Sequence, residues 1–540
     1  MILGRMRQSL VYRPHYRCDR LFIDNTIAAT RVHLGIVQAE EQPFSRGDVH
    51  LWFDGELYPA PSQEKITAHE LLLSNYSHDN LFPFLHTIDG IFTAVIYDGK
   101  KQTLLLISDR YGLRHLYYCA DNAGISWASE IKVFKHLPGQ SLDVNPDRVS
   151  EFIHTGYFSG NSTWFDAVKL LEPATVLSWD IKNASFERKQ YWNWGEIKPM
   201  RETIAVQAVS EALGIAFKKA VQKRCRIGER IGLGLSGGLD SRAIFASLPS
   251  FTEPIKVITF GREGCNDIHI ARQVAALRPS SHCILPIGRD NWLNNRREGI
   301  WLTDGQINLL HMHGIEQIDD IRDFFDIGLN GFLGDALLGG SYGGHTDDEL
   351  ARYADRGRRF IAMGLSLDNI AIHTRIPFFD NDLMELTMSI PMKYRRGSFI
   401  YNRMLLETFP DFFRSIPWQK TGMPISAAGP FWETIRFIRR CYYKAQRKIA
   451  SLPGNIGYTD YPFWIRGDPA RTFFSDLLTS KSAMLYEYID PNMVTAHLSR
   501  HFAGLDYTEL LGRYVTLEIW MRQFFKGELM EIHKPADLHP

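Results

Sequence analysis

The chain has 540 residues, of which 45% are hydrophobic and 23% charged, a composition typical of folded globular proteins. Lys and Arg together number 61, as do Asp and Glu, so no overall field recruits nucleic acid or an anionic membrane. The six cysteines form no CxxC pair, and no apolar run is long enough for a membrane span. We expect two or three domains in the cytoplasm, without nucleic-acid or membrane partners.

The first part of the chain is rich in strand patterns. Strands are expected at residues 49–53, 90–98 and 103–108, and the turn at 99–102 makes the last two a hairpin. Residues 54–58 are expected to close the first strand. A helix should begin near Pro146 and end at Gly156, and we place a domain boundary between residues 195 and 196.

Strands and helices alternate in residues 196–540, which predicts a doubly wound parallel sheet. The expected strands are residues 231–235, 255–261, 282–286 and 327–330. A helical extension should complete the C-terminal part. Within it, residues 435–449 combine a basic face with an apolar stripe, typical of a solvated amphipathic helix.

A glycine-rich turn follows the first of these strands and precedes helical residues. Strand, glycine turn and helix together aim backbone N–H groups at an anion, and the glycines let phosphate approach closely. No Gly-Lys-Ser/Thr follows, so this is not a Walker loop. The expected ATP-binding residues here are Leu235, Ser236, Gly237, Gly238, Asp240 and Ser241, with Asp240 also a ligand for Mg²⁺.

A second glycine-rich loop follows the strand at 327–330. Asp335 stands among its glycines and offers a second hard oxygen ligand for Mg²⁺. Because parallel strands present their carboxyl ends at one edge, Asn330 and Gly331 should lie near the first turn. Phe260 ends a neighbouring strand, where an adenine would sit.

These two loops, residues 375–380 and residues 420–424 resemble, in order, four motifs of the asparagine synthetase superfamily. β-Lactam synthetases and lasso-peptide cyclases are relatives. The resemblance implies an ATP-pyrophosphatase domain that adenylates a carboxylate, with Mg²⁺ on Asp240 and Asp335. It places Lys420 at the departing pyrophosphate and Arg375 among the catalytic residues.

Residues 1–195 resemble the glutaminase domain of the same enzymes, at residues 53–58, 109–112 and 128–130. The resemblance implies an Ntn-hydrolase-like α/β/β/α sandwich, so the whole chain is expected to be of the α/β class. It departs where chemistry is needed: Ile2 replaces the nucleophilic cysteine, Asp54 the glutamine-binding Asn, and Ala68 the second anchor. Since an aliphatic side chain cannot replace a thiolate, we expect an inactive glutaminase domain.

The general base of amide formation is also changed. Phe332 stands where the second loop of asparagine synthetases has Glu, and His373 replaces the Glu two residues before Arg375. His373 is either the base or a structural histidine, since neutral imidazole suits proton transfer near pH 7. Arg242 is expected either to meet phosphate or to point to solvent.

The resulting hypothesis is an ATP-dependent, amide-forming ligase that releases AMP and pyrophosphate. Its substrate would be a small-molecule or peptide carboxylate, and the nitrogen would come from ammonia, from a partner or from an amine of the substrate itself. The last case would make it a cyclase or tailoring enzyme. RNA thiolation and a catalytically silent ATP-binding homologue are the alternatives. A homodimer is left open.

Overall fold

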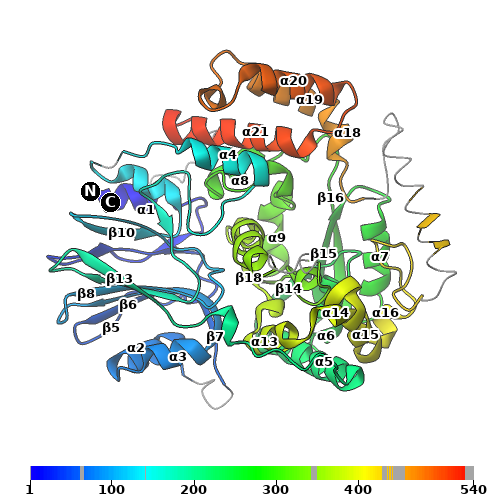
Figure 1. Cartoon of the computed structure of the whole chain (residues 1–540), viewed down its shortest axis with the longest axis horizontal. Helices are drawn as coiled ribbons and strands as arrows, with labels where there is room; N and C mark the ends of the chain where they lie inside the picture. The colour runs from blue at the N-terminus through cyan, green and yellow to red at the C-terminus, as the bar shows by residue number, and fades with distance from the viewer. Residues whose placement is uncertain are drawn as a thin grey trace.

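Antiparallel sheets form the first part of the molecule and a parallel sheet with helices forms the rest (Figure 1). The structure is a computed structural model that describes residues 2–60, 66–139, 141–341, 349–427 and 457–528, with residues 434, 435, 437, 438 and 441.

The N-terminal part is built on a six-stranded antiparallel sheet in the order β13-β12-β8-β7-β6-β5. Its strands are β5 (Phe44–Arg46), β6 (Val49–Tyr58), β7 (Asp89–Asp98), β8 (Thr103–Ser108), β12 (Thr175–Asp180) and β13 (Ser185–Gln190). The predicted hairpin is confirmed, because β7 pairs with β8 in antiparallel register. The expectation that residues 54–58 close the first strand is wrong, since β6 stays paired with β7 through Tyr58. Gly55 permits this at a φ of +115°, where a Cβ would meet the carbonyl oxygen of Ile91 at 2.2 Å.

Further layers cover the two faces of this sheet. A second sheet of β10, β9 and β11 packs on one face, and two helices pack on the other. The elements are β9 (Tyr117–Asp121), β10 (Gly124–Ala128), β11 (Lys169–Leu170), α2 (Ala68–Ser77) and α3 (Leu81–Thr87). Near the N-terminus lie α1 (Ile2–Gln8), β1 (Arg17–Cys18) paired with β4 (Val32–His33), and β2 (Phe22–Ile23) paired with β3 (Ala28–Ala29). The expected sandwich is confirmed.

The connecting helix α4 (Pro146–Thr155) has the predicted ends. Asn145 caps its start through the N–H of Asp147, and Gly156 ends it with a left-handed φ of 84°.

The C-terminal part contains a five-stranded parallel sheet in the order β16-β15-β14-β17-β18. Its strands are β14 (Ile231–Gly234), β15 (Ile255–Gly261), β16 (Ser280–Pro286), β17 (Ile327–Leu329) and β18 (His373–Arg375). The chain moves outward from β14 to β16, then returns to the other side with β17 and β18. This confirms the doubly wound sheet and puts its switch point between β14 and β17, where ligands bind in such folds.

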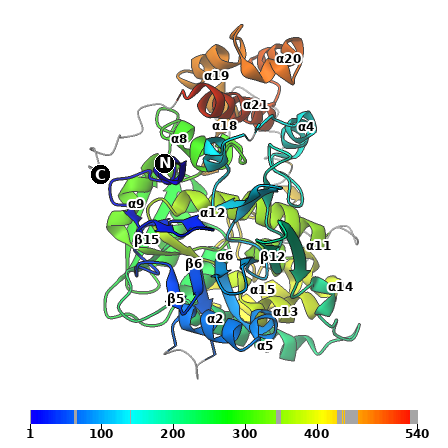
Figure 2. The ribbon, with the colours of Figure 1, turned by 90° about the vertical axis from the view of Figure 1, so that its left-hand side faces the viewer.

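Helices surround the sheet and extend beyond it (Figures 1 and 2). They include α5 (Val206–Lys223), α6 (Asp240–Ser247), α7 (Asn266–Ala275), α8 (Arg296–Leu302), α12 (Ala362–Asp368), α13 (Asn381–Ser389), α15 (Phe399–Thr408) and α16 (Pro410–Phe413). The C-terminal extension is helical as expected, with α18 (Tyr461–Ile465), α19 (Ala470–Leu478), α20 (Pro491–Phe502) and α21 (Thr508–Met521). The basic helix expected at 435–449 lies largely outside the described residues.

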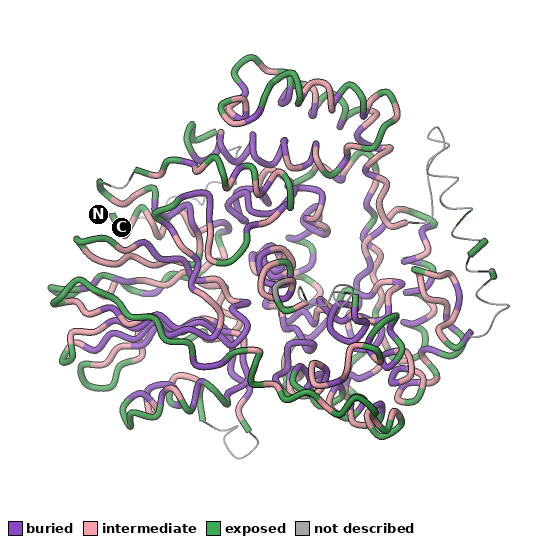
Figure 3. Tube along the Cα trace, in the orientation of Figure 1, coloured by how far each residue is buried: buried purple, intermediate pink, exposed green. Residues whose placement is uncertain are grey.

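One apolar core runs through both parts of the molecule, as the buried segments of Figure 3 show. It contains Leu51 and Ile107 of the antiparallel sheet together with Leu233 and Phe378 from around the parallel sheet. Across the junction, the rings of Tyr111 and Phe379 meet edge to face at 5.3 Å. The two parts therefore pack as one body. None of the described helices is long and apolar enough to cross a membrane.

Candidate active site

The turn after β14 holds its own N–H groups through short polar side chains. The backbone N–H of Ser236 donates to Oγ of Ser241 at 3.1 Å, and that of Gly238 donates to Oγ of Ser236 at 3.2 Å. Ser241 lies in the first turn of α6, so the loop is folded back onto the start of this helix. Leu235 is buried beneath it. The predicted strand, turn and helix are thus present, and the binding of phosphate at this turn stays a prediction.

Gly237 is the point at which other segments meet this turn. Its N–H donates to Oδ1 of Asp267 at 3.0 Å, and its carbonyl accepts the N–H of Gln419 at 3.0 Å. A Cβ on Gly237 would lie 2.7 Å from Cβ of Gln419, so only glycine permits this approach. Burial raises the pKa of Asp267.

Arg242 is buried and bonds backbone carbonyls, so the expectations that it meets phosphate or points to solvent are both wrong. Its guanidinium donates to the carbonyls of Gly237 at 3.2 Å, Ile416 at 3.2 Å and Pro417 at 2.7 Å. The side chain is only 1% exposed, and burial lowers its pKa to about 10. Arg242 therefore links the glycine turn after β14 to the segment that leads to Lys420.

The second loop closes directly onto the first. The N–H of Asp335 donates to Oδ2 of Asp240 at 2.9 Å. Glycines make the approach feasible: a Cβ on Gly334 would lie 2.5 Å from Cγ of Asp240, and one on Gly331 would lie 3.0 Å from N of Ser241. The loop starts at Asn330, whose N–H donates to the carbonyl of Arg375 at 2.9 Å.

Asp240 lies in an environment that disfavours an isolated negative charge. Burial, with the neighbouring charge of Asp335, raises its pKa to about 7. Lys420 and a hydrogen bond from the Tyr401 hydroxyl at 2.8 Å act in the opposite direction. Tyr401 comes from α15. At the switch point of the sheet Asp240 is therefore bonded by the Tyr401 phenol and the Asp335 N–H, and the charges of Asp335 and Lys420 act on it.

Lys420 sits on a tight turn beside the phosphate loop. Trp418 and Met423 pair across this turn, and Nζ of Lys420 lies 5.3 Å from the Trp418 ring centroid. The preceding residue, Gln419, makes the bond to Gly237. The turn that carries Lys420 is thus brought to the glycine turn after β14, and the role of Lys420 at the departing pyrophosphate stays a prediction.

The residues around Asp240 fit a magnesium ion held jointly with phosphate oxygens. Asp335 is half-buried, and in the described part of the chain no donor bonds its carboxylate. A buried carboxylate with a second carboxylate as its neighbour favours a bound cation, and hard oxygen donors are what Mg²⁺ takes. The described residues contain no cluster of three or more protein ligands, so substrate oxygens would complete the shell.

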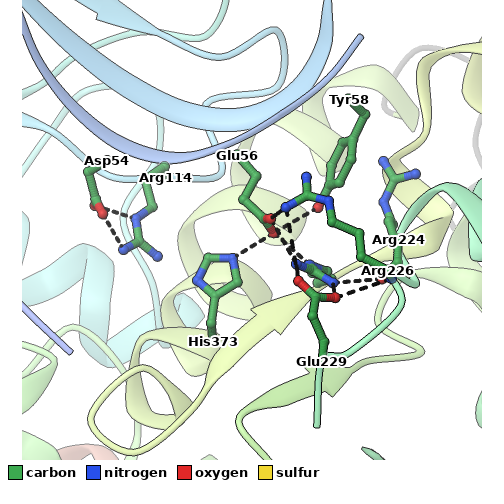
Figure 4. A network of polar contacts seen from close by, with 9 residues as sticks. Asp54, Glu56, Tyr58, Arg114, Arg224, Arg226, Glu229 and His373 are labelled. Carbon is green, nitrogen blue, oxygen red and sulfur yellow. Dashed lines mark hydrogen bonds and ion pairs between the residues drawn. The ribbon is translucent and has the colours of Figure 1, made fainter. Parts of the chain in front are cut away.

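His373 faces Glu56 of the N-terminal domain, as Figure 4 shows, and Arg375 bonds the same carboxylate. The two residues are two positions apart on β18, so their side chains point to the same face of the sheet. There Glu56 of β6 meets both: its Oε2 lies 3.0 Å from Nε2 of His373 and 2.6 Å from Nε of Arg375. Burial opposes the charge on Glu56, but His373 and Arg375 outweigh it and hold its pKa well below the usual range.

All five N–H groups of the Arg375 guanidinium are used within the protein. Besides Nε, its terminal nitrogens bond Glu56 at 2.8 Å, Glu229 at 2.5 and 2.6 Å, and the carbonyl of Arg224 at 2.9 Å. No donor is left for a substrate. A catalytic role for Arg375 stays a prediction, and in this geometry it would act through its neighbours.

A cavity of about 200 Å³ lies between the two parts of the molecule and is lined by His373. On its other wall Asp54 is held by Arg114 through two hydrogen bonds of 2.5 and 2.9 Å. Burial opposes the Asp54 charge, but Arg114 lowers the pKa below its usual value. No described cysteine lines this cavity.

The structure also adds residues that sequence reasoning missed. Asp267 and Tyr401 contact the phosphate loop and Asp240, and Glu56 contacts His373. Asp267 could have been predicted, because it is an acidic residue at the start of the helix that follows β15. No local sequence pattern indicated a role for Tyr401. Phe260 packs its ring on Gly314, where a Cβ would lie 2.8 Å away, and its adenine contact stays a prediction.

Comparison with known proteins agrees with this arrangement. Residues 4–192 match the glutamine amidotransferase domain, and residues 212–369 match the asparagine synthase domain. A putative asparagine synthetase (glutamine-hydrolyzing) of Methanocaldococcus jannaschii is 23% identical over 465 residues, covering 77% of each chain. The asparagine synthetase (glutamine-hydrolyzing) of Homo sapiens is 24% identical over 416 residues, covering 67% of this chain and 69% of that one.

The fold and the paired loops define a carbon–nitrogen ligase that forms AMP and pyrophosphate. The chain belongs to the asparagine synthetase superfamily, as an amidotransferase-like domain followed by an asparagine synthase domain. At the level of this family it is an ATP-dependent amidation ligase.

Proposed function

We propose that this ligase adenylates a substrate carboxylate and passes the acyl group to ammonia or an amine that its own N-terminal domain does not make from glutamine. The observation that carries the proposal is the hydrogen bond of Asp335 to Asp240 at the switch point of the sheet, together with the charge of Lys420, which acts on Asp240. These groups match the charge that moves when a carboxylate oxygen attacks the α-phosphorus and pyrophosphate leaves.

In the first half-reaction the protein contributes mainly charge and position. Lys420 meets negative charge developing on pyrophosphate. The turn at Ser236 to Gly238 would cradle the phosphates once their oxygens replace the side-chain acceptors that its N–H groups have in this structure. Asp240 and Asp335 would hold Mg²⁺, which screens the phosphate oxygens when bound. The products are the acyl-adenylate and pyrophosphate.

In the second half-reaction nitrogen attacks the acyl carbon, AMP leaves and the nitrogen loses a proton. His373 is our candidate acceptor of that proton. Its Nε2 is engaged with Glu56, which leaves Nδ1 on the side of the ring away from that bond. Phe332 cannot take the proton, and it packs against the apolar core.

Two features support an external source of nitrogen. Both carboxylate oxygens of Asp54 accept hydrogen bonds from Arg114, and an ionised carboxylate has no N–H to donate as an amide would at that position. The cavity beside it also has no described thiol to form an acyl-enzyme. The nitrogen would be free ammonia, ammonia from a partner or an amine of the substrate.

The test is carboxylate-dependent exchange of pyrophosphate into ATP, followed by amide formation. Aspartate, glutamate and short peptides carrying them serve as the carboxylate panel, with ammonium, glutamine or no added nitrogen. We expect exchange with one or more carboxylates and product without glutamine. Product without added nitrogen would identify an amine within the substrate. Conversion of ATP to ADP instead of AMP would contradict the proposal.

A further inference from the structure

Glu56 is a heavily engaged carboxylate at the junction of the two domains (Figure 4). It lies on β6, in the N-terminal domain, and is 3% exposed. Oε2 bonds His373 and Arg375 at 3.0 and 2.6 Å, while Oε1 bonds Arg375 and Arg226, each at 2.8 Å. Its principal partners therefore belong to the synthetase domain, although Glu56 itself belongs to the amidotransferase-like domain.

The arrangement determines which nitrogen of His373 is free. A carboxylate accepts a hydrogen bond from Nε2–H, and in a neutral imidazole the lone pair is then on Nδ1. The bond also fixes the ring plane, because Glu56 is itself held by the bidentate contact with Arg375. Glu229 supports Arg375 from the opposite side at 2.5 and 2.6 Å. A carboxylate that orients a histidine base in this way is a recurring catalytic device.

Other charged groups face His373 as well. Asp54 and Arg114 lie across the cavity of about 200 Å³, and Arg375 is on the same strand. Asp54 and Arg114 neutralise each other. Among the described residues, Glu56 is thus the carboxylate that contacts the His373 ring directly.

We propose that Glu56 is a positioning residue for the ligase reaction, and that the N-terminal domain serves the synthetase site by holding His373 in the Nε2–H tautomer. The inference rests on the proposed function in that it assigns the proton to His373. It gives a domain without a glutaminase nucleophile a direct part in amide formation. The chain needs this domain for the second half-reaction even when ammonium is supplied.

The orientation of His373 is tested without any substrate. In protein labelled with ¹⁵N-histidine, the imidazole signal of His373 is assigned by its loss in His373→Gln. We expect the Nε2–H tautomer in the native protein and in Arg226→Gln, which removes a bond to the other oxygen of Glu56. In Glu56→Gln the tautomer signal should weaken or broaden. An unchanged signal in Glu56→Gln overturns the proposal.

The functional consequence is tested by separating the half-reactions. With the carboxylate of the panel that gives most exchange, Glu56→Gln should keep pyrophosphate exchange within about threefold but lose at least about tenfold in amide formation from ammonium. Hydroxylamine, a strong nucleophile that is unprotonated near neutral pH, should restore most of the product as hydroxamate. In a His373→Ala background the Glu56 change should cost little more, because the two residues act in series.

A matched control separates positioning from mere weakening of the interface. Glu298→Gln removes the charge from another interdomain ion pair, to Arg13, in which His373 takes no part, and should leave both half-reactions unchanged. Parallel loss of exchange and amide in Glu56→Gln, or equal losses with ammonium and hydroxylamine, would make Glu56 a structural clamp. Absence of exchange in the native protein would refute the proposed function instead, and the tautomer measurement would still decide the role of Glu56.

Discussion

The backbone N–H of Asp335 donates a hydrogen bond of 2.9 Å to Oδ2 of Asp240, joining two residues 95 positions apart in the chain. The contact brings two glycine-rich loops together at the point where the order of the parallel strands reverses. It also leaves the Asp335 carboxylate beside that of Asp240, whose pKa is raised to about 7. This pairing is the basis of the first prediction.

Asp240→Asn and Asp335→Asn should each lower turnover by at least about a thousandfold, since charge that stabilises the leaving pyrophosphate is lost. The double variant should be scarcely slower than either single one, because both residues act on one ion. Steady-state pyrophosphate release measures this. Asp326→Asn, at the amino end of β17 and paired with Arg230, is the matched control and should retain activity. Additive losses would show that the two carboxylates act separately.

Glu56 should make the stability of the protein depend on acidity. Its pKa in the folded protein is held well below the 4.5 of a free side chain, so the folded state binds fewer protons than the unfolded state between these values. The stabilisation is therefore complete above pH 4.5 and is lost as pH falls through the folded pKa. Urea unfolding midpoints of the native protein and Glu56→Gln should differ most at neutral pH and converge in acid. A constant difference would contradict this assignment.

Arg242 should be required for both stability and nucleotide binding. Arg242→Met removes the described donor of the carbonyls of Ile416 and Pro417, at a cost of about 2–4 kcal/mol in the free energy of unfolding. The Lys420 turn would also loosen, so the apparent affinity for ATP should fall. Arg230→Met, at the other end of β14 and 53% exposed, should change neither quantity. Denaturant unfolding and ATP titration measure the two effects.

Glutamine should not serve as a nitrogen source. Purified protein with ATP, Mg²⁺ and glutamine should release no glutamate above background, whereas ammonium or an amine should support product. Cys18 is exposed on β1, and partial burial raises the pKa of its thiol, so it is a poor nucleophile at neutral pH. Cys18→Ser should therefore behave like the native protein. Sustained glutamate release would refute the idea of an inactive glutaminase domain.

The parts of the structure that could be predicted are those that depend on residues close together in the sequence. The apolar run and glycines of residues 231–238 predicted the strand and turn, and β15 occupies the seven residues expected for it. The hairpin of β7 and β8 followed from its turn residues. The domain boundary at 195 and 196 stays a prediction.

What could not be predicted depends on contacts between distant segments. β18 has only three residues, too few for a periodic pattern, and it forms because β17 pairs with it. The bond from Tyr401 to Asp240 spans 161 positions and that from Arg375 to Glu56 spans 319. No local pattern carries such information. For the same reason Arg242 was assigned to phosphate or solvent, although it binds carbonyls in the interior.

The central claim is that this site adenylates a carboxylate with the help of Lys420. Exchange of labelled pyrophosphate into ATP, with the carboxylate panel and Mg²⁺, tests it most directly. The account predicts exchange that requires the carboxylate, disappears in Lys420→Ala and persists in Lys393→Ala, an exposed lysine paired with Glu202. Exchange that persists undiminished in Lys420→Ala, or a protein that binds ATP but exchanges no pyrophosphate with any carboxylate, would contradict it.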